Sequence, residues 1–212
     1  MKILELFCGT KSFSKVAEKQ GHECVTIDIN PEFNPTVCVD LLDTNDAMDV
    51  MDSLEDYDMV WMSPPCTTFS MASGNTHWNA DRTPKTETGR EARRLLYLCE
   101  SIGAYCKSKG KLFVIENPRA RARWFLPVEW RDTAWYCQYG DKRAKPTDFW
   151  HNIPNLKLKQ CHNGNLDHEQ APRGSKTGTQ GMKLHERYKI PEKLCEEILN
   201  CIALSKANET IY

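Results

Sequence analysis

Apolar residues gather in short runs, and the segments between most of these runs have helical spacing. Each run is bounded by Gly, Pro, Asn or Asp, which is typical of buried strands. We expect strands at residues 3–7, 24–29, 37–39, 59–62 and 112–115, and two more within 134–150, split by Gly140 and Pro146. The spacing predicts helices over residues 12–20, 43–54, 91–109 and 190–204. This alternation predicts an α/β protein with a doubly wound, mostly parallel, Rossmann-like sheet.

Residues that are able to bind a ligand or take part in a reaction follow five of the expected strands. They are Phe7-Cys8-Gly9, Asp28, Asp40, Ser63-Pro64-Pro65-Cys66 and Glu116-Asn117. In a parallel sheet the carboxyl ends of the strands lie at one edge, and ligands bind there. We therefore expect these residues to converge on one rim of the sheet.

The bulk composition suits one domain spanning residues 1–212. Of the 212 residues, 40% are hydrophobic, and the formal net charge is −1. The first 60 residues are acidic on balance and the remainder is basic, so one part of the chain is suited to contact a polyanion. The sequence has neither a signal peptide nor the roughly 18 consecutive apolar residues of a membrane span, so we expect a cytoplasmic protein. The ten cysteines include no C-x-x-C pair, which indicates reduced thiols.

The first strand ends suit a ligand that carries adenosine without phosphates. Neither a G-x-G-x-x-G fingerprint nor a P-loop is present, which disfavours dinucleotides and nucleoside triphosphates. Asp28, about 20 residues beyond Gly9, is suited to bind ribose hydroxyls. Asp40 is suited to accept a hydrogen bond from an adenine amino group. The predicted cofactor-binding residues are Phe7, Cys8, Gly9, Asp28, Ile29, Asp40 and Pro64.

The sharpest signal for chemistry is Ser63-Pro64-Pro65-Cys66. Two prolines fix the backbone and present the next side chain rigidly, at a strand end where structural cysteines are uncommon. Glu116-Asn117-Pro118 ends a neighbouring strand, and a carboxyl group there can act as a general acid or base.

These ordered motifs resemble the DNA cytosine-5 methyltransferase family. That family has a strand-ending F-x-G, a P-C dipeptide and an E-N dipeptide in this order, and here they correspond to Phe7-Cys8-Gly9, Cys66 after Pro65, and Glu116-Asn117. The match is clear over residues 1–118, and the Tyr188–Pro191 segment resembles the family's last motif. The chain looks like a compact, phage-like member. The resemblance implies the Rossmann-like methyltransferase fold and S-adenosylmethionine as the cofactor.

The resemblance also implies a covalent mechanism on DNA. The Cys66 thiolate adds to carbon 6 of a flipped cytosine, and Glu116 protonates or hydrogen-bonds ring nitrogen 3. Carbon 5 then takes the methyl group, and loss of the carbon 5 proton releases the thiolate. Residues 67–86 are expected to form a loop that closes over the base. We expect a monomer or a weak dimer, with no membrane partner.

The chain also departs from the family pattern. Pro118 stands where the family usually has valine, and the Q-x-R-x-R strand is only loosely echoed by residues 138–143. Arg119, Arg121 and Arg143 are therefore all candidates for the arginine that contacts the cytosine oxygen. The predicted catalytic residues are Cys66, Glu116, Asn117, Arg119 and Arg143. Only about 35 residues, 150–185, are available as a reduced target-recognition insertion.

Several alternatives stay open at the level of sequence. Amino-methyltransferases also carry a Pro-Pro motif, but an aromatic residue follows it, whereas Cys66 follows here. A transfer-RNA cytosine-5 methyltransferase and a catalytically silent DNA-binding relative share the same pattern. Arg119, Arg121 and Arg123 beside Trp124 suit either phosphate contacts or a solvated loop. Cys161, His162 and His168 match no standard zinc spacing and show no fourth ligand, so we predict no metal.

Overall fold

The computed structural model of the chain describes residues 1–162, 164–169 and 182–209. Its centre is a seven-stranded sheet in the order β3-β2-β1-β4-β5-β7-β6. The strands are β1 Lys2–Leu6, β2 Glu23–Asp28, β3 Val37–Cys38, β4 Met59–Met62, β5 Leu112–Pro118, β6 Arg131–Trp135 and β7 Pro146–His151. Strands β1 to β5 pair in parallel, whereas β7 is antiparallel to both of its neighbours, β5 and β6.

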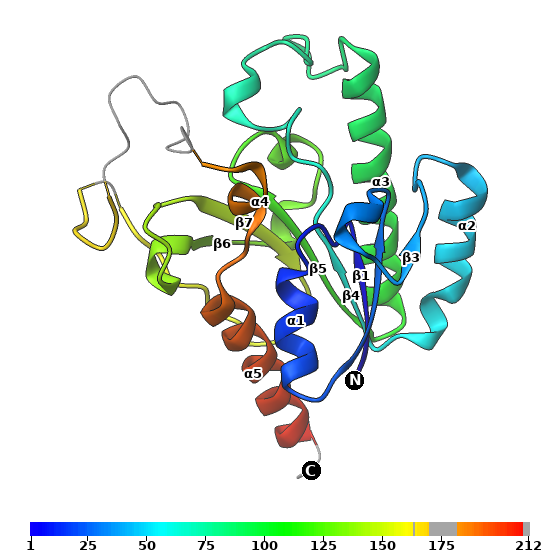
Figure 1. Cartoon of the computed structure of the whole chain (residues 1–212), viewed down its shortest axis with the longest axis vertical. Coiled ribbons are helices and arrows are strands. Elements are labelled where there is room, and N and C mark those ends of the chain that lie inside the picture. Colours follow the sequence, from blue (N-terminus) through cyan, green and yellow to red (C-terminus); the bar gives the residue numbers. More distant parts are fainter. Residues whose placement is uncertain (163, 170–181, 210–212) are drawn as a thin grey trace.

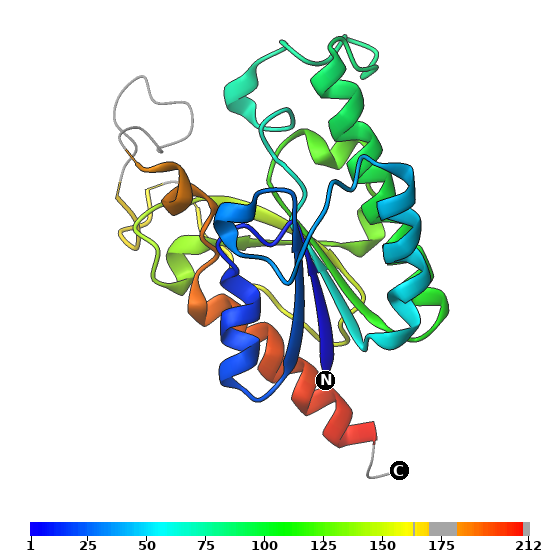
Figure 2. The same cartoon turned by 45° about the vertical axis from the view of Figure 1, so that its right-hand side comes forward.

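Helices cover both faces of the sheet (Figures 1 and 2). The helices are α1 Ser12–Lys19, α2 Thr44–Ser53, α3 Glu87–Ser108, α4 Leu184–Tyr188 and α5 Glu192–Glu209. Short 3-10 turns lie at Pro31–Phe33, Leu54–Asp56, Met71–Ser73, Arg121–Trp124, Val128–Trp130 and Tyr136–Tyr139. Figure 2 shows α1 and α5 side by side on one face, with α2 and α3 on the other. The sheet is therefore the middle layer of three.

The alternation of side chains along each strand separates two hydrophobic cores. In β1, Leu4 and Leu6 pack in the core that includes α2 and α3, whereas Ile3 packs in the core that includes α1 and α5. Trp61 of β4 is fully buried in the second core, and its ring stacks on Phe13 of α1 with centroids 4.0 Å apart. Burial of apolar area on both faces, at about 25 cal/mol per Å², is the main term that holds the layers together.

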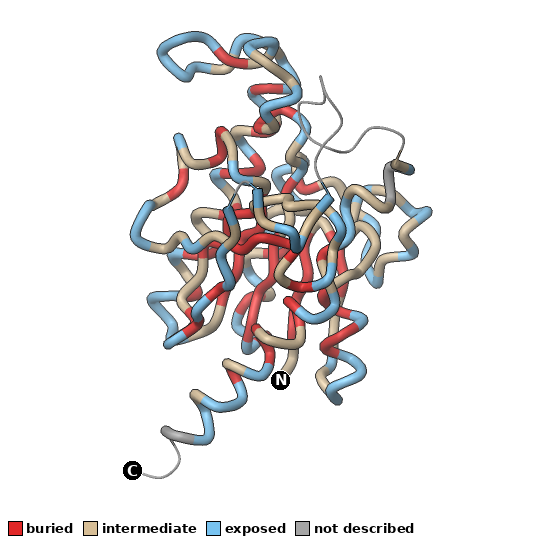
Figure 3. The backbone as a smooth tube through the Cα atoms, turned by 90° about the vertical axis from the view of Figure 1, so that its left-hand side faces the viewer, coloured by how far each residue is buried: buried red, intermediate tan, exposed pale blue. Residues whose placement is uncertain are grey.

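Burial is concentrated in the central strands, and the outer loops are mostly exposed (Figure 3). Within the described part of the chain, no helix has the length and apolar character that a membrane span requires.

The predicted fold class is confirmed: the protein is an α/β, Rossmann-like, mostly parallel sheet in the order of the S-adenosylmethionine-dependent methyltransferase fold. Strand β4 has the predicted bounds. Helix α3 begins four residues earlier than predicted, at Glu87, because the Thr86 side chain caps it by accepting a hydrogen bond from the Gly89 amide.

The prediction of a strand through residues 134–139 was wrong beyond Trp135. Residues Tyr136–Tyr139 form a 3-10 turn that ends at Gly140, whose φ is +91°. The aromatic residues there raise strand propensity, but their side chains are needed for packing against α5. Tyr139, for example, is buried, and its hydroxyl donates to Glu197 of that helix at 2.9 Å.

Candidate active site

The loop after β1 has an unusual backbone. Phe7, Gly9 and Lys11 have φ values of +57°, +47° and +56°, which is the left-handed region. A β-carbon placed on Gly9 would meet no atom within 4 Å, so the space beside this backbone is open. Cys8 between them is buried, and burial raises the pKa of its thiol to about 12. Cys8 can therefore present only its backbone to a ligand at this rim.

Asp28, at the end of β2, holds the β1 loop in place. One carboxylate oxygen accepts from the Gly9 amide at 2.8 Å, and the other accepts from the Asn30 amide at 2.9 Å. Each oxygen of a carboxylate accepts more than one hydrogen bond, so Asp28 keeps acceptor capacity for a hydroxyl group. Asp28 thus combines a structural contact with the predicted ribose contact.

The third strand end completes the rim that would hold an adenosine. Asp40 is half-buried, and one of its carboxylate oxygens accepts from the Leu42 amide at 2.9 Å. Ile29, next to Asp28 in the chain, leaves 61% of its surface exposed. Two acidic groups with an exposed apolar side chain and an open glycine backbone fit a nucleoside, and no basic group is needed because there is no phosphate to bind. The donor set therefore fits the cofactor that the sequence predicts.

Cys66 lies in a tight turn directly beyond β4. Its carbonyl accepts from the amides of Phe69, at 3.1 Å, and Ser70, at 2.8 Å. The preceding Ser63 amide donates to the Leu6 carbonyl at 3.2 Å, so the pairing of β4 with β1 continues to the start of the Pro-Pro pair. The backbone of Cys66 is thus fixed on both sides, and its side chain is half-buried.

The end of β5 is tied directly to this turn. Asn117 is buried, and its side-chain amide donates to the Pro64 carbonyl at 3.1 Å. Its side-chain carbonyl oxygen is buried and has no hydrogen-bond partner among the described residues. The neighbouring Glu116 is buried as well, with 9% of its surface exposed, and it accepts from the Tyr136 hydroxyl at 3.2 Å. The structure therefore brings Cys66, Glu116 and Asn117 together, as the sequence predicts.

Burial controls the protonation of both reactive groups. Burial, together with the smaller effect of the Glu116 carboxylate, raises the pKa of the Cys66 thiol to about 11. Burial also raises the pKa of Glu116 above its usual range. A carboxyl group with a raised pKa keeps its proton nearer to neutral pH, which suits a proton donor.

Lys145 is a candidate site residue that the sequence does not single out. Its ammonium nitrogen lies 4.5 Å from the centre of the Tyr136 ring and donates to the Arg187 carbonyl at 3.0 Å. Among the described residues, Lys145 is the cation whose charge lowers the pKa of both Cys66 and Glu116. Burial in turn lowers the pKa of Lys145 itself. Cys66, Glu116 and Lys145 therefore form one electrostatic group.

The three arginines that the sequence offered for the cytosine oxygen lie in different surroundings. Arg143 forms an ion pair with Asp141, Arg121 is buried, and Arg119 is exposed with its guanidinium 5.2 Å from the centre of the Trp135 ring. Arg121 donates to the Ser70 carbonyl at 2.8 Å, so it anchors the loop that follows Cys66.

In the basic stretch of Arg119, Arg121 and Arg123, most of the side chains are engaged in contacts within the protein. Arg123 donates through two nitrogens to the buried carboxylate of Asp148, at 2.5 and 2.6 Å. Of Arg119, Arg121 and Arg123, only Arg119 is exposed. Arg119 is thus the member of the stretch that is most accessible to a phosphate.

The long loop after Cys66 has a small core of its own. Phe69 is fully buried, and its ring stacks on Trp78 with centroids 5.4 Å apart. The Trp78 indole nitrogen donates to the Thr68 carbonyl at 2.8 Å. Phe125, beyond β5, packs against both rings. These contacts hold the base of the loop beside the end of β5.

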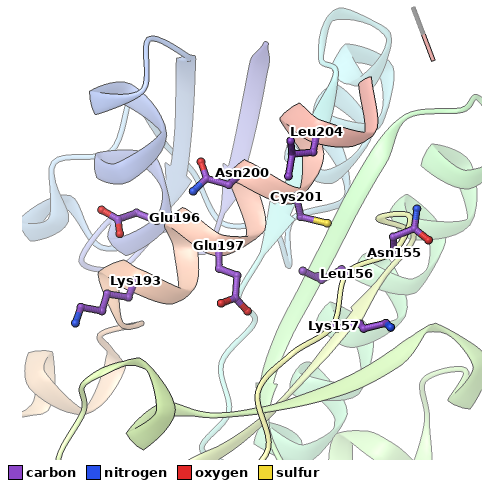
Figure 4. Close-up of a pocket in the computed structure, with 9 residues that line it drawn as sticks. All are labelled: Asn155, Leu156, Lys157, Lys193, Glu196, Glu197, Asn200, Cys201 and Leu204. Carbon is purple, nitrogen blue, oxygen red and sulfur yellow. The ribbon is translucent and has the colours of Figure 1, made fainter. Parts of the chain in front are cut away.

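Figure 4 shows a groove formed by other residues. It is lined by Asn155, Leu156, Lys157, Lys193, Glu196, Glu197, Asn200, Cys201 and Leu204. These residues belong to α5 and to the segment after β7, and α5 runs toward the end of the sheet where β1 begins (Figure 1). None of the predicted site residues lines this groove.

Comparison with known proteins gives one full-length sequence relative. It is the "Probable DNA (cytosine-5)-methyltransferase" of Frog virus 3 (isolate Goorha), which is 28% identical over 218 aligned positions that cover 94% of this chain and 99% of the relative. None of the protein-family models matches the chain.

Two solved structures show weaker likeness. The S. pombe Dnmt2 methyltransferase has a TM-score of 0.48 at 15% identity, over 76% of this chain and 51% of that one. A SAM-dependent methyltransferase from Archaeoglobus fulgidus has a TM-score of 0.30 at 22% identity, over 55% of this chain and 44% of that one. The chain thus spans about half the length of these solved structures.

The strand order, with an antiparallel β7 between β5 and β6, defines an S-adenosylmethionine-dependent methyltransferase fold. The ordered motifs at its rim resemble those of the DNA cytosine-5 methyltransferase family, and the chain is similar over nearly its whole length to the viral relative whose name places it in that family.

Proposed function

We propose that the chain transfers a methyl group to carbon 5 of cytosine in DNA through a covalent adduct with Cys66. One observation supports this most directly. The Asn117 amide binds the Pro64 carbonyl, and this contact links the Cys66 turn to the strand end that carries the buried Glu116. A nucleophile and a proton donor held together at one rim are what covalent activation of a pyrimidine ring requires.

The thiol of Cys66 must lose its proton before it attacks. Its thiolate then forms a bond to carbon 6 of the cytosine, and the electron pair of the carbon 5–carbon 6 double bond moves toward the ring nitrogen. Lys145 favours the thiolate, because its charge lowers the pKa of Cys66. The adduct makes carbon 5 nucleophilic, and carbon 5 takes the methyl group. Removal of the carbon 5 proton by a base then restores the double bond and expels the thiolate.

Glu116 would supply the proton that keeps negative charge off the ring. Its raised pKa favours the protonated form, and the Tyr136 hydroxyl holds the carboxyl group in position. We assign to Lys145 the contact with the cytosine oxygen for which Arg119, Arg121 and Arg143 were candidates. An ammonium group beside Cys66 and Glu116 can donate to that oxygen and stabilise the adduct.

The bound cofactor, S-adenosylmethionine, would supply the electrophilic methyl group. We propose that the backbone of Phe7, Cys8 and Gly9 lines its site, with Ile29 and Pro64 contributing apolar contacts. Asp28 would bind the ribose hydroxyls and Asp40 the adenine amino group.

The cofactor site predicts micromolar binding of S-adenosylhomocysteine. A dissociation constant of about 1 µM corresponds to about 8 kcal/mol. Asp40→Ala should weaken binding by about tenfold, or about 1.4 kcal/mol, because one hydrogen-bond acceptor is lost. Asp49→Ala, which removes an exposed carboxylate from α2, is the matched control and should leave the constant unchanged. Calorimetry that detects no binding at high micromolar ligand would refute the proposed cofactor.

The function itself is tested by sequencing methylated DNA. Base recognition in the major groove needs several side chains, each good pair giving about 1–3 kcal/mol of discrimination. With only the insertion at residues 150–185 available, we expect a short target of roughly two to four base pairs. Phosphate contacts should dominate affinity, so DNA binding should fall steeply with salt. Bisulfite sequencing of DNA treated with the purified chain and S-adenosylmethionine measures the target.

The same assay separates the alternatives. Methylation of transfer RNA but not of duplex DNA would assign the chain to an RNA substrate. Cofactor binding without methylation of either nucleic acid would indicate a silent DNA-binding relative. A long, strictly read site with salt-insensitive binding would mean that residues 119–185 form a larger recognition element than proposed.

A further inference from the structure

A second cluster of reactive side chains lies outside the proposed active site. Cys137, in the 3-10 turn after β6, meets Cys161 and His168 from the segment that follows β7. The two sulfurs and a ring nitrogen of His168 all lie within 4.8 Å of one another. The distance from the Cys161 sulfur to Nδ1 of His168 is 3.6 Å. The proposed methyl-transfer mechanism uses none of these three residues.

One distance in the cluster matches a tetrahedral zinc site, and the other two lie within 4.8 Å. Zinc binds thiolate sulfur at about 2.3 Å and imidazole nitrogen at about 2.0–2.1 Å, so tetrahedral ligands stand about 3.8 Å apart for two sulfurs and about 3.6 Å apart for sulfur and nitrogen. The observed 3.6 Å between Cys161 and His168 agrees with this value. Two thiolates and an imidazole are also a ligand set that zinc prefers.

Each of the two sulfurs has a side-chain amide donor beside it, as metal-bound thiolates often do. Asn165 donates to the Cys161 sulfur at 3.3 Å, and Gln138 lies 3.9 Å from the Cys137 sulfur as a donor. Both amides also donate to one oxygen of Asp167, at 3.0 and 2.8 Å. N–H donors stabilise metal-bound thiolates and orient them. Asp167, the acceptor for both amides, lies next to the cluster but is not among the three residues whose ligand atoms stand within 4.8 Å of one another, so its carboxylate would have to move to reach a metal.

We propose that Cys137, Cys161 and His168 bind a zinc ion, with Asp167 or a water molecule in the fourth position. The ion would serve a structural purpose. Among the described residues around the cluster, 159–162 and 164–169, none is buried and the apolar Leu166 is 98% exposed, so hydrophobic packing does not hold this part of the chain. Metal ligation supplies folding free energy where a core is lacking.

The position of the cluster connects the metal to the active-site rim. Cys137 directly follows Tyr136, whose hydroxyl donates to Glu116. The segment that the zinc would hold lies within residues 150–185, the predicted recognition insertion. The site escaped detection in the sequence because Cys137 stands far from the other two ligands along the chain and only the fold brings it to them.

The experiment measures metal content in the full-length chain, produced without a histidine tag in zinc-supplemented medium. We expect about one zinc per chain by atomic emission, as structural sites require. Cys161→Ala and His168→Gln should each lower the zinc content at least about tenfold. Cys201→Ala, which removes another half-buried thiol, is the matched control and should keep the metal.

Cobalt substitution tests the ligands even if a variant folds poorly. Cobalt added to the chelator-treated wild-type chain should give thiolate-to-metal charge-transfer absorption and the visible bands of a tetrahedral site, and Cys137→Ala should lose the charge-transfer intensity. Three results would overturn the proposal. They are a wild-type chain that takes up neither metal, zinc retained in both Cys161→Ala and His168→Gln, and a Cys137–Cys161 disulfide found by peptide mapping without reductant.

Discussion

Replacing Cys66 with serine is expected to abolish methyl transfer, with a fall in kcat of roughly 10⁴-fold or more. A serine hydroxyl ionises far less readily than a thiol and is a much weaker nucleophile toward carbon 6 than a thiolate. The covalent complex with DNA that contains 5-fluorocytosine should disappear as well. Binding of S-adenosylhomocysteine should stay, because the rim at Gly9, Asp28 and Asp40 does not depend on the Cys66 side chain. Denaturing gels measure the complex, and calorimetry measures the cofactor.

Cys201→Ser is the matched control for this substitution. Cys201 is also half-buried, but it lies on α5, away from the rim. This variant should methylate DNA and form the 5-fluorocytosine complex as the wild type does. Near wild-type methylation by Cys66→Ser would rule out the covalent mechanism, whereas loss of both activities in Cys201→Ser would point to instability instead.

The strands of the first half of the chain could be predicted because local signals and tertiary packing agree there. Residues 59–62 form a buried strand whose four side chains are all apolar, and the prolines that follow mark its end. The region after Gly110 is harder, because aromatic residues favour a strand wherever they stand. The run from Trp135 to Tyr139 has the composition of a strand. Residues Tyr136–Tyr139 nevertheless form a 3-10 turn, in which Tyr139 contacts α5. Nothing local in the sequence records that tertiary requirement.

The location of the candidate site was likewise predictable, except for the part that depends on the direction of β7. Parallel strands end at the rim, so Cys66, just beyond β4, and Glu116, in the last residues of β5, are easily found. Strand β7 is antiparallel and therefore begins at that rim, with Thr147 opposite Pro118 of β5. The residue that reaches the rim from β7 is the one just before it, Lys145. Without the direction of β7, the sequence cannot distinguish Lys145 from its neighbours Lys142 and Arg143.

Glu116→Gln is expected to lower kcat by about 10²–10⁴-fold, the range for loss of a general acid. Glutamine keeps the size of the side chain and can still accept from the Tyr136 hydroxyl, but it cannot deliver a proton to ring nitrogen 3. The fold should persist, which thermal unfolding can verify. Asp49→Ala, on the exposed face of α2, controls for loss of a carboxylate elsewhere and should leave kcat unchanged. A decrease of less than about tenfold in Glu116→Gln would remove Glu116 from the proposed mechanism.

The reactivity of Cys66 toward iodoacetamide should reveal the same group of charges in the absence of DNA. The pKa of the thiol is raised to about 11 by burial, and a raised pKa keeps a thiol protonated. At pH 7 about one chain in 10⁴ therefore carries the thiolate, and alkylation should rise about tenfold per pH unit up to about pH 10. Once the pH exceeds its own pKa, Glu116 carries a negative charge that raises the pKa of Cys66, so the Glu116→Gln profile should move to lower pH even though its turnover falls. Lys145→Met removes the positive charge that lowers the pKa, so its profile should move to higher pH.

Peptide mass spectrometry separates Cys66 from the other cysteines. A plateau below pH 8, or shifts of both variants in the same direction, would show that these charges do not act on Cys66 as proposed.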